Sequence, residues 1–247
     1  MTKIGQHYKV VISNYLIQIT TIISLIYFWN DVSLLWIALG YFFFGFCILD
    51  GYLHRYLAHR AYEMPRALEI PFCIISTLVL QNSAIAWASN HVTHHKYSDK
   101  EGDSHPASDW FGTWFWIGTN KSTLNPFAVR KLITDKLYVF QQDHYFKIFF
   151  TLMFILFLIS PMFTLCFVMA NIVFGFHVTS IINVLTHKIG YRNFDIDDNS
   201  TNLNIFLIPS NLHNNHHKYP RSINNSTKWY EIDLTYYFIK LIKSNQH

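Results

Sequence analysis

Histidine is the side chain in this sequence that could do chemistry, because eight of the fourteen histidines fall in three short clusters. Two clusters share the spacing H-x-x-H-H, and residues three and four apart lie on one face of an α-helix. We therefore expect the imidazoles of His91, His94 and His95 to point the same way and to converge on one ion. Imidazole is a good ligand for iron, zinc and copper. The clusters are His54 and His59; His91, His94 and His95; and His213, His216 and His217.

The number of histidines indicates two metal ions. Eight imidazoles exceed what one ion can use, since a zinc site usually takes four ligands. A ninth candidate is His187, at the end of the last apolar tract, with Asn183 one turn before it on the same face. The alternative, a set of separate solvated or core histidines, is disfavoured by the repeated spacing.

The composition indicates a membrane protein, and the length fits a single domain over residues 1–247. Hydrophobic residues make up 51% of the chain, and only 14% is charged, against roughly 25% in an ordinary soluble domain. The three cysteines are isolated, so we expect buried thiols and neither a disulfide framework nor an iron–sulfur site. The net charge of +4 comes from Lys and Arg that flank two apolar tracts, 10–54 and 148–187. This distribution favours a lipid environment and not a nucleic-acid partner.

Four transmembrane helices are expected in an all-α fold, over residues 10–29, 32–49, 146–159 and 162–185. A fifth apolar run, 68–88, contains Glu69, Gln81 and Asn82, which a span would have to bury. We therefore expect this run to lie at the interface or to dip into it. As a true span it would place His91 across the membrane from His54.

This topology places the N-terminus, residues 50–145 and residues 186–247 on one side of the membrane. Every Lys and Arg falls there or, in the case of Lys147, at the adjoining start of the third predicted span, as the positive-inside rule expects for the cytoplasm. The two regions form a predicted cytoplasmic helical cap that carries all three clusters, with a loop at 195–204 and an amphipathic stretch at 229–242. The expected location is a bacterial inner membrane, or the endoplasmic reticulum in a eukaryote.

Polar residues outside the clusters have separate interpretations. Asp50, at the end of the second predicted helix, would pair with Arg55 or orient a ligand histidine through its other ring nitrogen. His177 is expected to be a buried membrane histidine or to line a substrate path. We expect His7, His144 and His247 to be solvated.

The clusters resemble the three histidine boxes of the membrane fatty acyl desaturases, and the similarity is greatest to the acyl-CoA delta-9 (stearoyl-CoA) desaturases. The similarity covers about residues 40–243. It includes Gly190-Tyr191-Arg192 and the element Asp103-Ser104-His105, which implies a role for His105 beside the site. One departure is Pro209-Ser210-Asn211-Leu212, where the family commonly has Gly-Glu-Gly-aromatic. The matching boxes are H-R-Y-L-A-H-R at 54–60, H-V-T-H-H-K-Y-S-D at 91–99 and H-N-N-H-H-K-Y-P at 213–220.

The resemblance implies a di-iron centre that uses O2 to insert a cis double bond, of the delta-9 type, into a long-chain acyl thioester. Removing hydrogen from an unactivated methylene needs an oxidant stronger than any side chain, and two irons with O2 can supply it. Asn183 would hold a metal-bound water. The implied iron ligands are His54, His59, His91, His94, His95, His187, His213, His216 and His217.

The resemblance also implies a substrate tunnel and an external electron donor. Gln81, Trp87 and Thr179 match positions at the bend of the tunnel, and bulky Phe42 and Phe46 would face its closed end and limit chain length. Electrons would come from a carrier such as cytochrome b5 or ferredoxin, because the chain has no G-x-G-x-x-G, P-loop or cysteine cluster. The acyl group could be carried by CoA, by acyl carrier protein or by a lipid.

Two alternative functions stay open. A related di-iron acyl hydroxylase or acetylenase would use the same oxidant on the same kind of chain. A membrane metal-binding or transport protein could also gather histidines, but it would be expected to place ionisable ligands within its spans.

Overall fold

The computed structural model describes residues 4–119 and 124–244, and the regular elements within these ranges are helices. The described residues contain no strand; isolated bridges join Tyr191 to Asn202 and Asn202 to Leu212. The prediction of an all-α fold is confirmed to this extent. The helices are α1 (Ile4–Tyr27), α2 (Leu34–Tyr41), η1 (Phe42–Ala58), α3 (Arg66–Ile75), η2 (Ser76–Val79), α4 (Ala84–Tyr97), α5 (Trp110–Phe115), α6 (Arg130–Thr134), α7 (Lys136–Asp143), α8 (Tyr145–Ile159), η3 (Phe163–Val168), α9 (Met169–Leu185), α10 (His213–Lys218) and α11 (Leu234–Ile242).

Three helices in the described residues are long and apolar enough to cross a membrane: His7–Tyr27, Leu34–Ala58 and Phe163–Leu185. Two bent helix pairs raise the number to five if each pair forms one span. The third predicted span corresponds to α8, which has 15 residues and is bent by 76° from α7. The number of four spans and the placement of the helical cap on the cytoplasmic side therefore stay predictions.

The second helix is longer than the sequence suggested. We expected it to end at Leu49, but α2 continues into η1 and ends at Ala58. Asp50 does not end the helix, because Arg55 Nη2 donates to its Oδ2 at 2.9 Å and both side chains are buried. η1 is π-helical: the N–H of His59 donates to the carbonyl of His54, five residues earlier, at 3.1 Å. This winding places residues five apart on the same face, and π-helical segments are frequent at functional sites.

The apolar run at 68–88 is not one straight helix. The segment Arg66–Val79 and the helix α4 meet at an angle of 77°. The turn between them uses positive φ at Leu80 (51°) and Asn82 (75°). The ring centroids of His54 and His91 are 4.4 Å apart, so this run does not carry the two histidines to opposite sides of a membrane.

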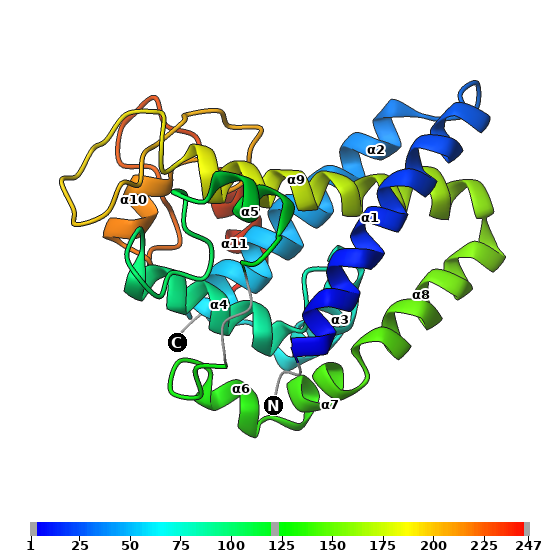
Figure 1. Cartoon of the computed structure of the whole chain (residues 1–247), viewed down its shortest axis with the longest axis horizontal. Helices are drawn as coiled ribbons and strands as arrows, with labels where there is room; N and C mark the ends of the chain where they lie inside the picture. The colour runs from blue at the N-terminus through cyan, green and yellow to red at the C-terminus, as the bar shows by residue number, and fades with distance from the viewer. Residues whose placement is uncertain (1–3, 120–123, 245–247) are drawn as a thin grey trace.

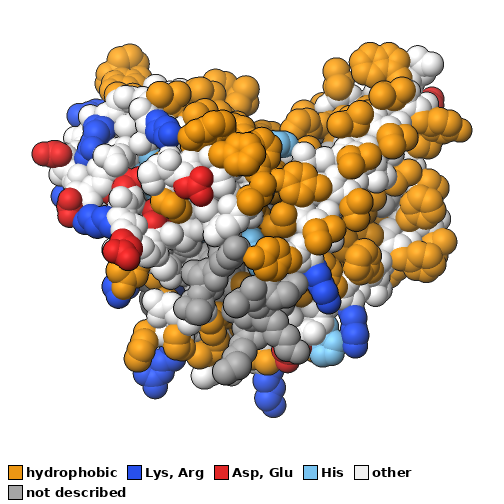
Figure 2. All heavy atoms as spheres, in the orientation of Figure 1, with side chains coloured by type: hydrophobic (Ala, Val, Ile, Leu, Met, Phe, Trp, Pro, Cys, Tyr) orange, Lys and Arg blue, Asp and Glu red, His pale blue; other side chains and the backbone are white. Residues whose placement is uncertain are grey.

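The long helices form a scaffold around which the shorter elements gather (Figure 1). α1 packs against α9, and η1 packs against both α4 and α11. Figure 2 shows apolar side chains over α1, α2 and α8, whereas Asp, Glu, Lys and Arg gather over the loops around α10. Exposed apolar residues such as Ile12 (59%) and Leu158 (67%) suit a lipid environment.

The C-terminal part of the chain is mostly irregular. The predicted loop at 195–204 lies in this part, and the predicted amphipathic stretch is helical only over α11. Buried Glu231 ties the region together by accepting hydrogen bonds from Asn215 Nδ2 at 2.9 Å and Tyr191 Oη at 2.7 Å. Asp233 attaches it to η1 by accepting from Arg55 Nη1 at 2.6 Å.

One predicted surface histidine is buried. His7 is only 6% exposed, because α1 begins at Ile4 and His7 shares its buried face with Val10 and Asn14. His144 is half-buried, and His247 lies outside the described residues. His177 is half-buried, and its ring lies near those of Trp114 and Phe176. The three cysteines are free and buried, as expected.

Candidate metal centre

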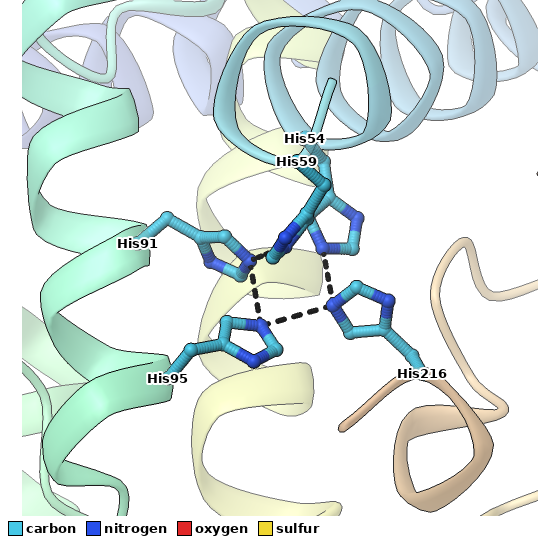
Figure 3. Close-up of side chains that lie close together, drawn as sticks. All are labelled: His54, His59, His91, His95 and His216. Carbon is cyan, nitrogen blue, oxygen red and sulfur yellow. Dashed lines mark hydrogen bonds between the residues drawn. The ribbon is translucent and has the colours of Figure 1, made fainter. Parts of the chain in front are cut away.

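Nine histidines from four parts of the chain meet in two groups. They come from η1, α4, α10 and the end of α9, and within each group one ring nitrogen per residue lies within 4.8 Å of the others. Figure 3 shows five of them, with rings from η1, α4 and α10 turned toward one another. The first group is His54, His59, His91, His95 and His216, and the second group is His94, His187, His213 and His217.

The grouping corrects the expectation that His91, His94 and His95 converge on one ion. His91 and His95 belong to the first group, but His94 belongs to the second. At 3.6 residues per turn, positions i and i+4 differ by about 40°, whereas the neighbours i+3 and i+4 differ by about 100°. The cluster on α10 divides in the same way: His213 and His217 join the second group and His216 joins the first. Each H-x-x-H-H helix therefore serves both groups.

The ring nitrogens that face the centre of each group are the Nε2 atoms. In the first group, His54 Nε2 lies 2.9 Å from His216 Nε2, and His91 Nε2 lies 3.0 Å from His95 Nε2. In the second group, His187 Nε2 lies 3.0 Å from His213 Nε2. The Nε2 atoms of His94 and His217 are buried and have no hydrogen-bond partner within the described chain.

Aspartates hold four of these rings from behind. Each accepts a hydrogen bond from an Nδ1 atom, which places the proton on Nδ1 and leaves a lone pair on Nε2. Lone pairs that converge in a buried space need a cation, so the nitrogen set fits a transition metal. The pairs are His54 with Asp50 at 2.7 Å, His94 with Asp103 at 2.8 Å, His187 with Asp99 at 2.8 Å and His217 with Asp198 at 2.9 Å.

Burial keeps the imidazoles of α10 neutral. It lowers the pKa values of His213, His216 and His217 well below the usual range, and neighbouring imidazoles lower them further. A neutral imidazole is the form that binds a metal, so these three rings are available as ligands at pH 7.

Both interpretations of Asp50 hold at once. Asp50 pairs with Arg55 and also accepts from His54 Nδ1. Its two oxygens further accept from Ser210 Oγ at 2.6 Å and Thr235 Oγ1 at 2.5 Å. Ser210 stands in the segment that departs from the family pattern, with φ of 56°. Its hydroxyl ties that segment to the buried carboxylate.

A cavity reaches both histidine groups. Its wall includes His54 and His91 of the first group and His213 of the second. The candidate residues Trp87, Thr179 and Asn183 also line it. The rest of the wall is Gly45, Leu49, Asp50, Val178, Ile182, Pro209 and Ser210.

The three predicted tunnel-bend residues lie together. Trp87 Nε1 donates to Gln81 Oε1 at 3.1 Å, and Gln81 Nε2 donates to Thr179 Oγ1 at 2.9 Å. The indole of Trp87 stacks on His91 with centroids 5.1 Å apart. Phe42 is 41% exposed and Phe46 is buried; they stack on each other but are not part of the cavity wall. Their role in chain length stays a prediction.

Sequence reasoning did not find three of the four aspartates that hold the rings. Asp99 closes the second histidine motif, and Asp198 lies in the segment that was predicted as a loop. Asp103 could have been found through its neighbour His105, whose ring lies 4.1 Å from that of His94. The useful signal is an aspartate four to nine residues from a ligand, as with Asp50 and His54 or Asp103 and His94.

Comparisons with known proteins identify the family of this chain. The fatty acid desaturase family model matches residues 31–240. The sn-1 stearoyl-lipid 9-desaturase of Synechocystis is 32% identical over 84% of this chain and 69% of its own length. The corresponding enzyme of Anabaena variabilis is 30% identical over 84% of this chain and 81% of its own length. The acyl-CoA 5-desaturase of Anemone leveillei is 30% identical over 77% of this chain and 62% of its own length. The chain belongs to the fatty acid desaturase family and is an oxidoreductase that desaturates fatty acyl chains.

Proposed function

We propose that this chain inserts a cis double bond, of the delta-9 type, into a long-chain acyl substrate with O2, two irons and external electrons. One observation carries the proposal: a largely apolar cavity is lined by histidines of both groups. An acyl chain in that cavity would lie beside both sets of Nε2 atoms. The proposed iron ligands are the nine histidines of the two groups, with Asn183 on the cavity wall as the residue that would hold a water.

The residues of the chain would bind and orient the substrate. Two bound irons would supply the oxidising power to remove hydrogen from an unactivated methylene. Leu49, Val178 and Ile182 would hold the acyl chain and exclude water. Trp87 would place the reacting methylene, because its indole is fixed by Gln81 and lies against His91.

The head group and the electron donor belong to the same proposal. We favour an acyl thioester, and the stearoyl-lipid desaturases among the relatives support an acyl lipid as the second candidate. Arg130, Lys131 and Lys136 are exposed on α6 and at the start of α7, where they could steer an acidic carrier such as cytochrome b5 or ferredoxin. Membership of the desaturase family removes the metal-transport alternative.

Expression in a host that lacks its own desaturase is the test of this proposal. We expect a cis monoene with the double bond at carbon 9 in the host lipids, located by mass spectrometry of derivatised fatty acids. Short pulses of labelled fatty acid would show whether the product appears first in the thioester pool or in intact lipids. A hydroxylated or acetylenic product would replace the proposal with one of the related reactions.

Gly45 is expected to control the length of the acyl chain. It lies on the cavity wall nine residues before His54, and a Cβ there would contact Pro209 Cγ at 3.6 Å, an ordinary separation. The larger side chain of Gly45→Leu would fill the cavity, so the ratio of longer to shorter monoenes should fall by about tenfold. Gas chromatography of the products measures this ratio.

Gly45→Ala is the matched control for this substitution. The added methyl group makes only ordinary contacts, so its product profile should match that of the unsubstituted enzyme. Equal profiles for Gly45→Leu and Gly45→Ala would show that the acyl chain does not pass this residue.

A further inference from the structure

We propose that the two metal positions are unequal: the second group binds its ion more tightly than the first group, and Asp99, Asp103 and Asp198 are the positioning residues responsible. The inference rests on the proposed two-metal centre. It concerns the order and strength of metal binding, which the proposed reaction does not determine.

The aspartates are distributed unevenly between the groups. In the second group, three of the four imidazoles donate Nδ1–H to a carboxylate: His94 to Asp103, His187 to Asp99 and His217 to Asp198. In the first group only His54, one of five, has such a partner in the described structure. An aspartate at Nδ1 fixes the ring and makes Nε2 a stronger donor to the metal.

The two groups also differ in whether a nearby Lys or Arg offsets the negative charge of these carboxylates. Asp50, behind the first group, is paired with the buried guanidinium of Arg55. Within the described residues, Asp99, Asp103 and Asp198 form no ion pair with Lys or Arg.

Backbone N–H groups hold the three unpaired carboxylates instead. Asn199 donates to Asp99 at 2.8 Å, Asp99 donates to Asp103 at 2.9 Å, and Ser200 donates to Asp198 at 2.9 Å. Such contacts orient a carboxylate without cancelling its charge.

Burial lets this charge act on the metal. The side chain of Asp103 is 1% exposed, and those of Asp99 and Asp198 are 11% and 12% exposed. Partly buried charges are screened by salt much less than surface charges. Three negative charges thus favour a cation in the second group. Behind the first group, Asp50 and Asp233 share the guanidinium of Arg55, which leaves a single net negative charge there.

The number of ligands acts in the opposite direction. The first group offers five nitrogens and the second offers four, so equal imidazoles would favour the first group. Loss of a hydrogen-bonding partner behind a ligand typically lowers metal affinity about 10- to 100-fold. We therefore expect three aspartate partners against one to outweigh a single extra nitrogen. The order in which the two groups bind metal tests this expectation.

Stepwise metal titration of the full chain in detergent tests the inference. The protein is first freed of metal with a chelator and then titrated anaerobically with Co²⁺, whose visible absorption reports its ligands, and with Fe²⁺. We expect two steps of one ion each, with dissociation constants at least about tenfold apart. A single step with two equivalent ions would overturn the inference.

Asparagine variants assign the steps to the groups. Asp198→Asn keeps the shape and can still accept from His217 Nδ1 but lacks the charge, so it should weaken the tight step about 10- to 100-fold. Asp50→Asn should change only the weak step. The neighbouring Asp197→Asn is the matched control, because that side chain is 96% exposed and should leave both steps unchanged. If Asp198→Asn weakens the loose step instead, the assignment is wrong.

Two further measurements keep the test decisive. If Asp198→Asn fails to fold, Asp103→Asn provides the same measurement, because Asp103 holds His94 of the second group. Asp198→Glu should restore the affinity of the tight step because it keeps the negative charge. The outcome is independent of the reaction: two unequal steps in a protein that makes no double bond would support this inference and reject the proposed function. Equal steps in an active desaturase would do the reverse.

Discussion

His94→Ala is expected to abolish desaturation and to reduce bound iron from two ions toward one per protein. His94 is the only residue of α4 in the second group, and its buried Nε2 has no other partner within the described residues. Alanine would remove one of four nitrogens and take from the buried carboxylate of Asp103 its imidazole donor, leaving only the backbone N–H groups of Asp99 and His105. Iron content by mass spectrometry and monoene content of host lipids are the two measurements.

His144→Ala is the control for this substitution. His144 is half-buried, lies outside both groups and should leave iron content and activity unchanged. Full activity in His94→Ala would remove the di-iron proposal altogether. Loss of activity with two ions still bound would show that His94 acts on the substrate and not on the metal.

Arg55→Met is expected to lower the free energy of unfolding by about 3–5 kcal/mol, the typical result of removing one partner from a buried ion pair. Arg55 is 1% exposed and pairs with Asp50 at 2.9 Å and Asp233 at 2.6 Å. Without it, two carboxylates remain in the interior with no cation of their own. Denaturant unfolding in detergent, followed by tryptophan fluorescence, measures the change.

Arg66→Met provides the matched comparison. Arg66 also pairs with two carboxylates, Glu69 and Asp135, but its side chain is 47% exposed. Exposed pairs contribute about 0.2–1 kcal/mol each, so this substitution should have a small effect. Equal losses in the two variants would mean that burial does not control the strength of the Arg55 pairs.

The ligand types could be predicted from the sequence, but their division between ions could not. The spacing of His91, His94 and His95 correctly indicated a helix, yet His94 joins a different group from His95 because neighbouring helix positions point about 100° apart. His54 and His59 would diverge on an α-helix, since five residues correspond to about 140° of rotation. Only the π-helical winding of η1 brings both into the first group.

Features that depend on contacts between distant segments were beyond the sequence. Asp99 and Asp198 reach their histidines from loops, and a loop path follows from tertiary contacts and not from a local pattern. The burial of His7 depends on how α1 packs. The sequence also did not show the bend next to the third predicted span: Tyr145–Ile159 is apolar over most of its length but has only 15 residues and meets α7 at 76°.

The first histidine group joins parts of the chain that are far apart in sequence. His54 and His216 are 162 residues apart in sequence, so an ion in the first group would close a very long loop. Closing such a loop restricts the unfolded chain as a covalent cross-link does. The irregular C-terminal segment that this closure holds in place includes Pro209 and Ser210, which form part of the cavity wall. Metal uptake would therefore stabilise the acyl-binding cavity, in addition to the hydrogen bond of Ser210 to Asp50 and the ion pair of Arg55 with Asp233 that already hold this segment.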